Sequence, residues 1–135
     1  MSITSALLIA TYNWPDALRL VLKSAMAQSQ LPDEILIADD GSKEETKQLI
    51  AEFQKTSKVP IKHFWQEDNG FRKSKILNKA VAGTSANYII QVDGDCIMHP
   101  KFVEDHCKAA QKGVYLYGSR VNVLPQGVPV VFEKQ

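Results

Sequence analysis

Four short strand-like segments, two of them continuous apolar runs, alternate with segments whose apolar residues recur at helical spacing, and this alternation is the strongest constraint on the fold. A short apolar run bounded by turn-forming residues is typical of a strand that is buried on both faces. Strands that alternate with helices form βαβ units, which need a parallel sheet covered by helices. The sequence therefore predicts an α/β fold with a doubly wound, mostly parallel sheet and helices on both faces. The expected strands are residues 6–10, 35–38, 61–65 and 88–92.

Helix signals follow each of the four runs. Pro15 suits the first turn of a helix, and Ser42 begins a capping-box pattern ahead of the second helix. Ile76 lies in a third segment with helical spacing, and Pro100 is expected to open a fourth helix. Another apolar run at 114–117 predicts the start of a fifth strand.

The length of 135 residues predicts one domain. We expect this domain to span residues 1–123 and to bind the ligand of the protein. Residues 124–135 are expected to form an irregular or edge-strand tail, because Pro125, Gly127 and Pro129 interrupt regular structure. The tail contains an apolar run at residues 130–132 near the end of the sequence. We therefore expect the chain to be the N-terminal portion of a longer protein with a further domain.

The composition excludes several classes of protein. The net charge is +1, so there is no basic excess of the kind that indicates nucleic-acid binding. No apolar run is long enough for a transmembrane segment, and no basic residue precedes the first strand as in a secretory signal. Cys96 and Cys107 fit reduced thiols, which are usually small core residues. We expect a cytoplasmic protein, with peripheral attachment to the inner face of the membrane left open.

Acidic and amide residues collect where the predicted strands end. The carboxyl ends of parallel strands meet at one edge of a sheet, and ligands bind there. Asp93, Gly94 and Asp95 follow the fourth strand, so two carboxylates can converge from one tight turn. Mg²⁺ and Mn²⁺ prefer such carboxylates together with phosphate oxygens and water. The sequence predicts a divalent-cation site here, with a solvated turn as the alternative.

The second strand ends in Asp39 and Asp40. Adjacent strand residues face opposite ways, so only one of the two can face the site, and we predict Asp40. A carboxylate there can accept a hydrogen bond from a nucleobase imide or a ribose hydroxyl. The alternative is that both residues help to cap the next helix, with Ser42 as the N-cap residue.

Cationic and aromatic residues complete the predicted site. Arg72 and Lys73 precede the third helix and are predicted to face a diphosphate, whereas Lys79 is assigned to the surface. Tyr12 is expected to stack on a base. Trp65 is interpreted as a core residue more readily than as part of a pocket.

Other motifs do not account for this chemistry. His106 and Cys107 are neighbours on a helix and diverge by about 100°, so a zinc site with Cys96 and His99 is not expected. The sequence contains neither the glycine fingerprint of dinucleotide-binding domains nor a P-loop.

Four ordered motifs resemble those of family 2 glycosyltransferases of the GT-A fold. They are ALLIATYN (6–13), IADDGS (37–42), NGFRKSK (69–75) followed by Asn78, and VDGDC (92–96). Within this family the chain is most similar to the N-terminal transferase domains of bacterial chondroitin polymerases, over about residues 3–121. The resemblance implies transfer of a sugar, such as N-acetylgalactosamine or another hexose derivative, from a UDP-sugar to a saccharide acceptor. It further implies inversion of the anomeric centre, dependence on Mn²⁺ or Mg²⁺, and a role in polysaccharide biosynthesis.

The resemblance also implies roles for individual residues. Asp40 would hold the uridine, and Asp93 would meet the ribose or the sugar, with Gly94 in the turn between the aspartates. Asp95 would bind the metal, with Asp93 as a second candidate ligand. The remaining implied contacts to the nucleotide-sugar are Ala10, Thr11, Tyr12, Arg72 and Lys73.

The sequence departs from the family pattern at Leu77, which precedes Asn78 where an Arg is common. The catalytic base is expected beyond Gln135, so this chain is interpreted as the donor-binding part, inactive in transfer by itself. Two alternatives stay open. One is a sugar-nucleotide-binding module without catalysis, and the other is a receiver-type signalling domain, which would carry its acidic pair after the first strand.

Overall fold

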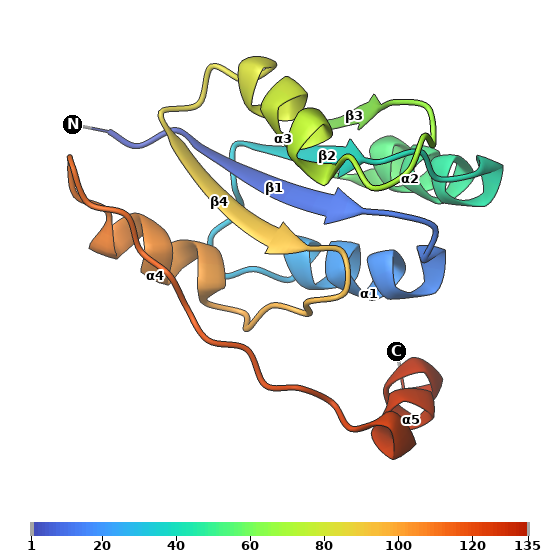
Figure 1. The fold of residues 1–135 in the computed structure, drawn as a ribbon. Coiled ribbons are helices and arrows are strands. Elements are labelled where there is room, and N and C mark those ends of the chain that lie inside the picture. Colours follow the sequence, from blue (N-terminus) through green and yellow to red (C-terminus); the bar gives the residue numbers. More distant parts are fainter. Residues whose placement is uncertain (1, 135) are drawn as a thin grey trace.

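The computed structural model describes residues 2–134. Its elements alternate strictly between strand and helix as far as α4 (Figure 1). The strands are β1 (Ser5–Thr11), β2 (Glu34–Asp39), β3 (Ile61–Trp65) and β4 (Tyr88–Asp93). The helices are α1 (Pro15–Met26), α2 (Glu44–Thr56), α3 (Lys73–Ala82), α4 (Phe102–Ala109), the short 3₁₀ helix η1 (Pro125–Gly127) and α5 (Val128–Glu133).

The four strands form one sheet in the order β3-β2-β1-β4, and every neighbouring pair is parallel. Strand β1 is central and all of its residues are buried, as expected for a continuous apolar run. Thr11 pairs with Asp39 of β2, and Ala10 pairs with Asp93 of β4. This register places the carboxyl ends of β1, β2 and β4 side by side.

Helices cover both faces of the sheet, which confirms the predicted doubly wound α/β fold. Figure 1 shows α3 on one side of the sheet, with α1 and α4 on the other. The larger core packs α1, α2 and α4 against the face that carries Leu7 and Ile37. The smaller core packs Ile76 and Ala80 of α3 against the opposite face, which carries Leu8 and Leu36.

The predicted strands and the first three predicted helices are confirmed, with changes at some boundaries. Helix α1 begins at Pro15 as predicted, whereas α4 begins at Phe102 rather than at Pro100. The predicted fifth strand at 114–117 is wrong, because these residues have no regular structure. In the expected tail, η1 and α5 stand in place of an irregular segment or an edge strand. Between residues 2 and 134, no helix combines the length and apolar character needed to cross a bilayer.

Candidate functional site

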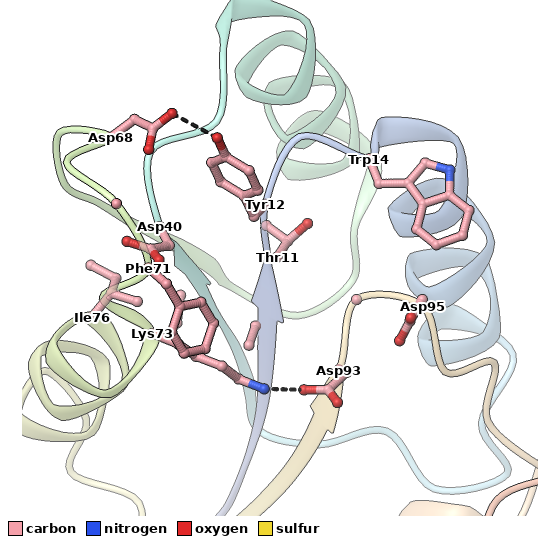
Figure 2. A pocket seen from close by; sticks show the side chains of 14 residues that line it. Thr11, Tyr12, Trp14, Asp40, Asp68, Phe71, Lys73, Ile76, Asp93 and Asp95 are labelled. Atoms are coloured by element: carbon pink, nitrogen blue, oxygen red, sulfur yellow. Dashed lines mark hydrogen bonds and ion pairs between the residues drawn. The ribbon is translucent and has the colours of Figure 1, made fainter.

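A cavity of about 380 Å³ opens at the carboxyl ends of β1, β2 and β4 (Figure 2). It lies where the parallel topology predicts a ligand site. Eight of the nine residues predicted for the site line it. These are Ala10, Thr11, Tyr12, Asp40, Lys73, Asp93, Gly94 and Asp95.

The side of the cavity next to β2, which we call the β2 side, is built around Asp40. Asp40 is 6% exposed, and both of its carboxylate oxygens already accept hydrogen bonds. Gln66 Nε2 donates to Oδ1 at 2.7 Å, and the backbone N–H of Arg72 donates to Oδ2 at 2.8 Å. A carboxylate has about four acceptor positions, so Asp40 can still accept from a ligand. Its orientation is fixed before any ligand arrives.

Asp39 faces away from the cavity, as the alternation along a strand requires. Its Oδ1 accepts from the backbone N–H of Ser42 at 2.9 Å, and its Oδ2 lies 2.8 Å from His63 Nε2. Asp39 is 1% exposed, so these contacts satisfy a buried carboxylate. The pair of aspartates therefore divides into one residue that holds the turn and one that lines the cavity.

Ser42 is not the N-cap of α2, and the predicted capping box is wrong. The N-cap residue is Lys43, and it makes no side-chain cap bond. The Ser42 hydroxyl instead accepts from the backbone N–H of Asn13 at 2.8 Å, while Asn13 Oδ1 accepts from the Lys43 N–H at 2.8 Å. Asn13 has φ +46°, a left-handed conformation that Asn tolerates better than most residues. These two bonds join the loop after β1 to the loop after β2.

Tyr12 and Asp68 form the rim of the β2 side. The Tyr12 hydroxyl donates to Asp68 Oδ2 at 2.7 Å, as Figure 2 shows. This hydrogen bond to a carboxylate raises the pKa of Tyr12 above its usual value, because the carboxylate holds the phenol proton. The Tyr12 ring is 51% exposed and borders the cavity, so a planar ligand can stack on it.

The opposite side, which we call the β4 side, carries Lys73, Asp93, Gly94 and Asp95. Lys73 Nζ binds Asp93 Oδ1 at 2.7 Å, and both side chains are about one-third exposed, at 34% and 39%. Figure 2 shows this ion pair at the end of β4, with Asp95 on the turn beyond it. A Cβ on Gly94 would lie 2.8 Å from the Ala10 carbonyl oxygen. The turn therefore packs directly on β1 and needs glycine at this position.

The cavity has a strong negative charge. Its lining contains four carboxylates, those of Asp40, Asp68, Asp93 and Asp95, against one ammonium, that of Lys73. The formal charge of these five side chains is 1 − 4 = −3. A phosphate-bearing ligand would be repelled unless a cation bound with it. Ligand atoms of Asp93, Asp95 and Cys96 lie within 4.8 Å of one another, which suits a divalent ion.

Arg72 does not lie where the sequence predicted it. It is absent from the cavity lining, and its Nη2 donates to the carbonyl of Glu67 at 2.8 Å. Its Nε is buried without a hydrogen-bond partner among the described residues. The side chain folds back on the loop after β3 because that carbonyl is within its reach. Arg72 serves the cavity through its backbone N–H, which holds Asp40.

Sequence reasoning missed two aromatic residues of the lining, Trp14 and Phe71. Phe71 is 87% exposed and Trp14 is 47% exposed, so neither shows the burial that an apolar pattern predicts. The available signal was position, because Trp14 follows Asn13 in the loop after β1 and Phe71 lies in the loop between β3 and α3. Trp65 does not line the cavity, and its Nε1 donates to the Ser42 carbonyl at 3.0 Å.

Comparison with known proteins finds a family and several relatives that match most of this chain. Residues 6–129 match the family model described as Glycosyl transferase family 2. The chondroitin synthase of Escherichia coli is 30% identical over 118 residues, which is 85% of this chain and 17% of that protein. The hyaluronan synthase of Pasteurella multocida is 28% identical over 102 residues, which is 75% of this chain and 10% of that protein.

Solved structures share the fold. The crystal structure of S. aureus TarS 1–349 in complex with UDP matches with a TM-score of 0.69 and 22% identity, over 78% of this chain and 31% of that one. The mannosyltransferase PcManGT from Pyrobaculum calidifontis, in complex with GDP-Man and Mn²⁺, matches with a TM-score of 0.63 and 18% identity. The match covers 72% of this chain and 29% of that one. The α/β fold is therefore of the GT-A type.

Proposed function

Because the chain belongs to glycosyl transferase family 2, we propose that it is the donor-binding part of a glycosyltransferase. The donor is a UDP-sugar, the acceptor is a saccharide, and transfer inverts the anomeric centre. The family match removes the receiver-type alternative. The observation that carries the proposal is the cavity itself, which combines a fixed, nearly buried Asp40 with the acidic turn Asp93–Asp95, next to the end of β1.

The β2 side binds the nucleoside. Asp40 accepts a hydrogen bond from the imide N–H of uracil, in addition to the two that it accepts within the chain. The end of β1, residues Ala10 and Thr11, lies beside the base, and the Tyr12 ring stacks on it. The UDP complex of TarS, which has the same fold, supports a uridine nucleotide as the ligand.

The β4 side binds the diphosphate and the sugar. Asp95 and Asp93 would hold a divalent cation, Mn²⁺ or Mg²⁺, and the chemistry of this donor set fits such an ion. The bound cation supplies charge stabilisation for the diphosphate leaving group. Lys73, which is bonded to Asp93 in this structure, would exchange that bond for one to a phosphate oxygen of the donor. Asp93 then accepts a hydrogen bond from a hydroxyl of the ribose or of the sugar.

We assign no catalytic base within residues 2–134. His99 Nδ1 accepts from the backbone N–H of Lys101 at 3.1 Å, and the His106 ring packs on Phe102 with centroids 4.6 Å apart. Neither histidine lines the cavity. The proposal therefore keeps the base beyond Gln135, together with the acceptor site.

Calorimetric titration of UDP, in Mn²⁺ and in EDTA, tests the proposal. We expect tighter binding in Mn²⁺, because the cation offsets the repulsion between the diphosphate and the acidic cavity. Asp95→Asn should remove the difference, whereas Asp105→Asn, on the exposed side of α4, should retain it. Equal affinity of the unmodified chain in both buffers would overturn the cation-dependent site. Transfer itself is measured by mass spectrometry, with a saccharide acceptor and a chain extended past Gln135.

A further inference from the structure

Cys96 lies at the acidic turn rather than in the core. Its side chain is half-buried, and its Sγ is 3.6 Å from Asp95 Oδ1. The thiol sulfur and one carboxylate oxygen from each of Asp93 and Asp95 all lie within 4.8 Å of one another. The expectation that Cys96 is an ordinary core thiol is therefore wrong.

The backbone of the turn explains this convergence. The N–H of Cys96 donates to the carbonyl of Asp93 at 3.1 Å, so residues 93 and 96 are the first and last of a hydrogen-bonded turn. The first and last residues of such a turn lie close together. The Gly94 N–H donates to the Ala10 carbonyl, which fixes the turn against β1.

The distances suit one shared ion. A metal bound to sulfur at about 2.3 Å and to oxygen at about 2.1 Å, in tetrahedral or octahedral geometry, holds those two atoms roughly 3 to 4 Å apart. The observed separation between Cys96 Sγ and Asp95 Oδ1 falls in this range. Lys73 occupies Asp93 Oδ1, which leaves Oδ2 of the same carboxylate for a cation.

We propose that Cys96 is a third protein ligand of the divalent cation at this turn, and that its sulfur biases the site toward thiophilic ions over Mg²⁺. The inference rests on the proposed function for the presence of a cation. Thiolate sulfur prefers Zn²⁺ and other soft or borderline ions such as Cd²⁺, whereas Mg²⁺ is bound by oxygen ligands. On binding, the thiol proton passes to water and a metal–sulfur bond forms.

The second cysteine is a matched control. Cys107 is partly buried against the larger core, and burial raises the pKa of its thiol. It belongs to no group of metal-ligating side chains among residues 2–134. A change of Cys107 to serine thus removes a thiol of the same chain without touching the turn.

The test titrates the reduced chain with Cd²⁺, Mn²⁺ and Mg²⁺ in the absence of nucleotide. Calorimetry gives the affinities, and ultraviolet absorption follows the sulfur-to-Cd²⁺ charge-transfer band. The variants are Cys96→Ser, Cys107→Ser and Asp95→Asn, and a melting curve for each one checks folding. We expect Cys96→Ser to lose the band and about tenfold or more in Cd²⁺ affinity, with Mg²⁺ affinity changed less than about twofold. Cys107→Ser should keep the band.

The outcomes separate this inference from the proposed function. If Asp95→Asn weakens Mn²⁺ while Cys96→Ser keeps both the band and the Cd²⁺ affinity, the sulfur ligand is overturned and the cation site stands. If the band disappears in Cys107→Ser instead, the inference is also overturned. If Asp95→Asn leaves all three affinities unchanged, the cation site of the proposed function fails as well.

Discussion

The two sides of the cavity are built in different ways. On the β2 side, Asp40 is 6% exposed, and both of its carboxylate oxygens accept hydrogen bonds from within the chain. On the β4 side, Asp95 is exposed, and Asp93 is held by one ion pair to a partly exposed Lys73. The β2 side is organised by folding itself, whereas the β4 side keeps groups that can change partners.

This difference matches what each side has to recognise. A planar base with fixed donors is bound best by groups that are already oriented, because ordering them on binding would reduce the affinity. A cation and a diphosphate bring large charges, so groups that exchange partners can follow them. Substitutions on the β2 side should therefore reduce stability and affinity together, and those on the β4 side should affect mainly ligand binding.

The largest effect is expected from Asp40→Ala. It leaves the Arg72 N–H without its acceptor and removes one of the two acceptors of the Gln66 amide. Both donors are partly buried, so the cost lies toward the lower end of the range of about 1–3 kcal/mol for a buried donor. Loss of the charged acceptor for uracil should weaken UDP binding by about 1.5–3 kcal/mol more. Denaturant unfolding and calorimetry measure the two effects.

Asp39→Ala is the matched control for Asp40→Ala. The substitution removes the partner of the buried Ser42 N–H and of His63. The Asp39 side chain, however, is not part of the cavity lining. We expect a loss of stability with little change in UDP affinity per folded molecule. If both variants bind UDP equally well, Asp40 is a structural residue only.

Gly94→Ala is expected to be an exception on the β4 side, because it should reduce both stability and ligand binding. The added Cβ would lie 2.8 Å from the Ala10 carbonyl oxygen and 3.1 Å from Thr11 Cβ, so the turn has to move away from β1. Such overpacking costs about 1–3 kcal/mol, and here it also displaces the acidic ligands. The melting temperature and the Mn²⁺ affinity from titration should both fall. Gly118→Ala, where an added Cβ meets nothing within 4 Å, should change neither, and a neutral Gly94→Ala would contradict the close packing.

Lys73→Met sharpens the comparison, because it should change binding with little effect on stability. A partly exposed ion pair contributes about 0–1 kcal/mol, so the melting temperature should hardly move. Without nucleotide, Mn²⁺ affinity should rise several-fold, because the Lys73 ammonium on Asp93 Oδ1 no longer repels a cation bound at the same carboxylate. UDP affinity should fall, because a phosphate partner is lost. Lys79→Met, in an exposed position of the same helix, should do neither. A fall in Mn²⁺ affinity would contradict this repulsion.

The periodicity of the sequence was enough to predict the architecture. The two interior strands, β1 and β2, are built on continuous apolar runs. Strand alternation allowed only one of Asp39 and Asp40 to face the site, and Asp40 was predicted because it lies nearer the turn. The same physics does not distinguish a short apolar run in a strand from one in a helix. Residues 130–132 therefore looked like an edge strand, although they lie in α5.

The details that were missed depend on particular contacts, one of them between distant residues and two within a single loop or turn. The capping box does not form because the Ser42 hydroxyl accepts a hydrogen bond from the backbone N–H of Asn13, which is 29 residues away. Arg72 was placed near a diphosphate by charge alone, but the Glu67 carbonyl lies within its reach. Cys96 was assigned to the core by composition, and only the closure of a turn brings it to the two aspartates. Residue type and hydrophobic spacing do not specify which of these contacts form.

The smallest effect is expected from Tyr12→Phe, which removes the hydrogen bond to Asp68 at the exposed rim of the β2 side. That bond raises the pKa of Tyr12 in the folded chain. A group with a raised folded pKa adds stability below its unfolded pKa, about 10 for tyrosine, and this contribution disappears as the pH rises through the folded value. The wild-type chain should therefore be slightly more stable than Tyr12→Phe at neutral pH, and the difference should vanish in alkali.

Asp68→Ala provides the complementary measurement, because it leaves the phenol and removes its acceptor. The ultraviolet titration of tyrosinate should then show Tyr12 ionising at lower pH than in the wild-type chain, since no carboxylate holds its proton. Tyr88, whose pKa is raised mainly by burial, should titrate unchanged in the same experiment. An unchanged titration of Tyr12 would mean that the rim contact does not persist in solution. The ordered part of the β2 side would then end at Asp40, inside the cavity.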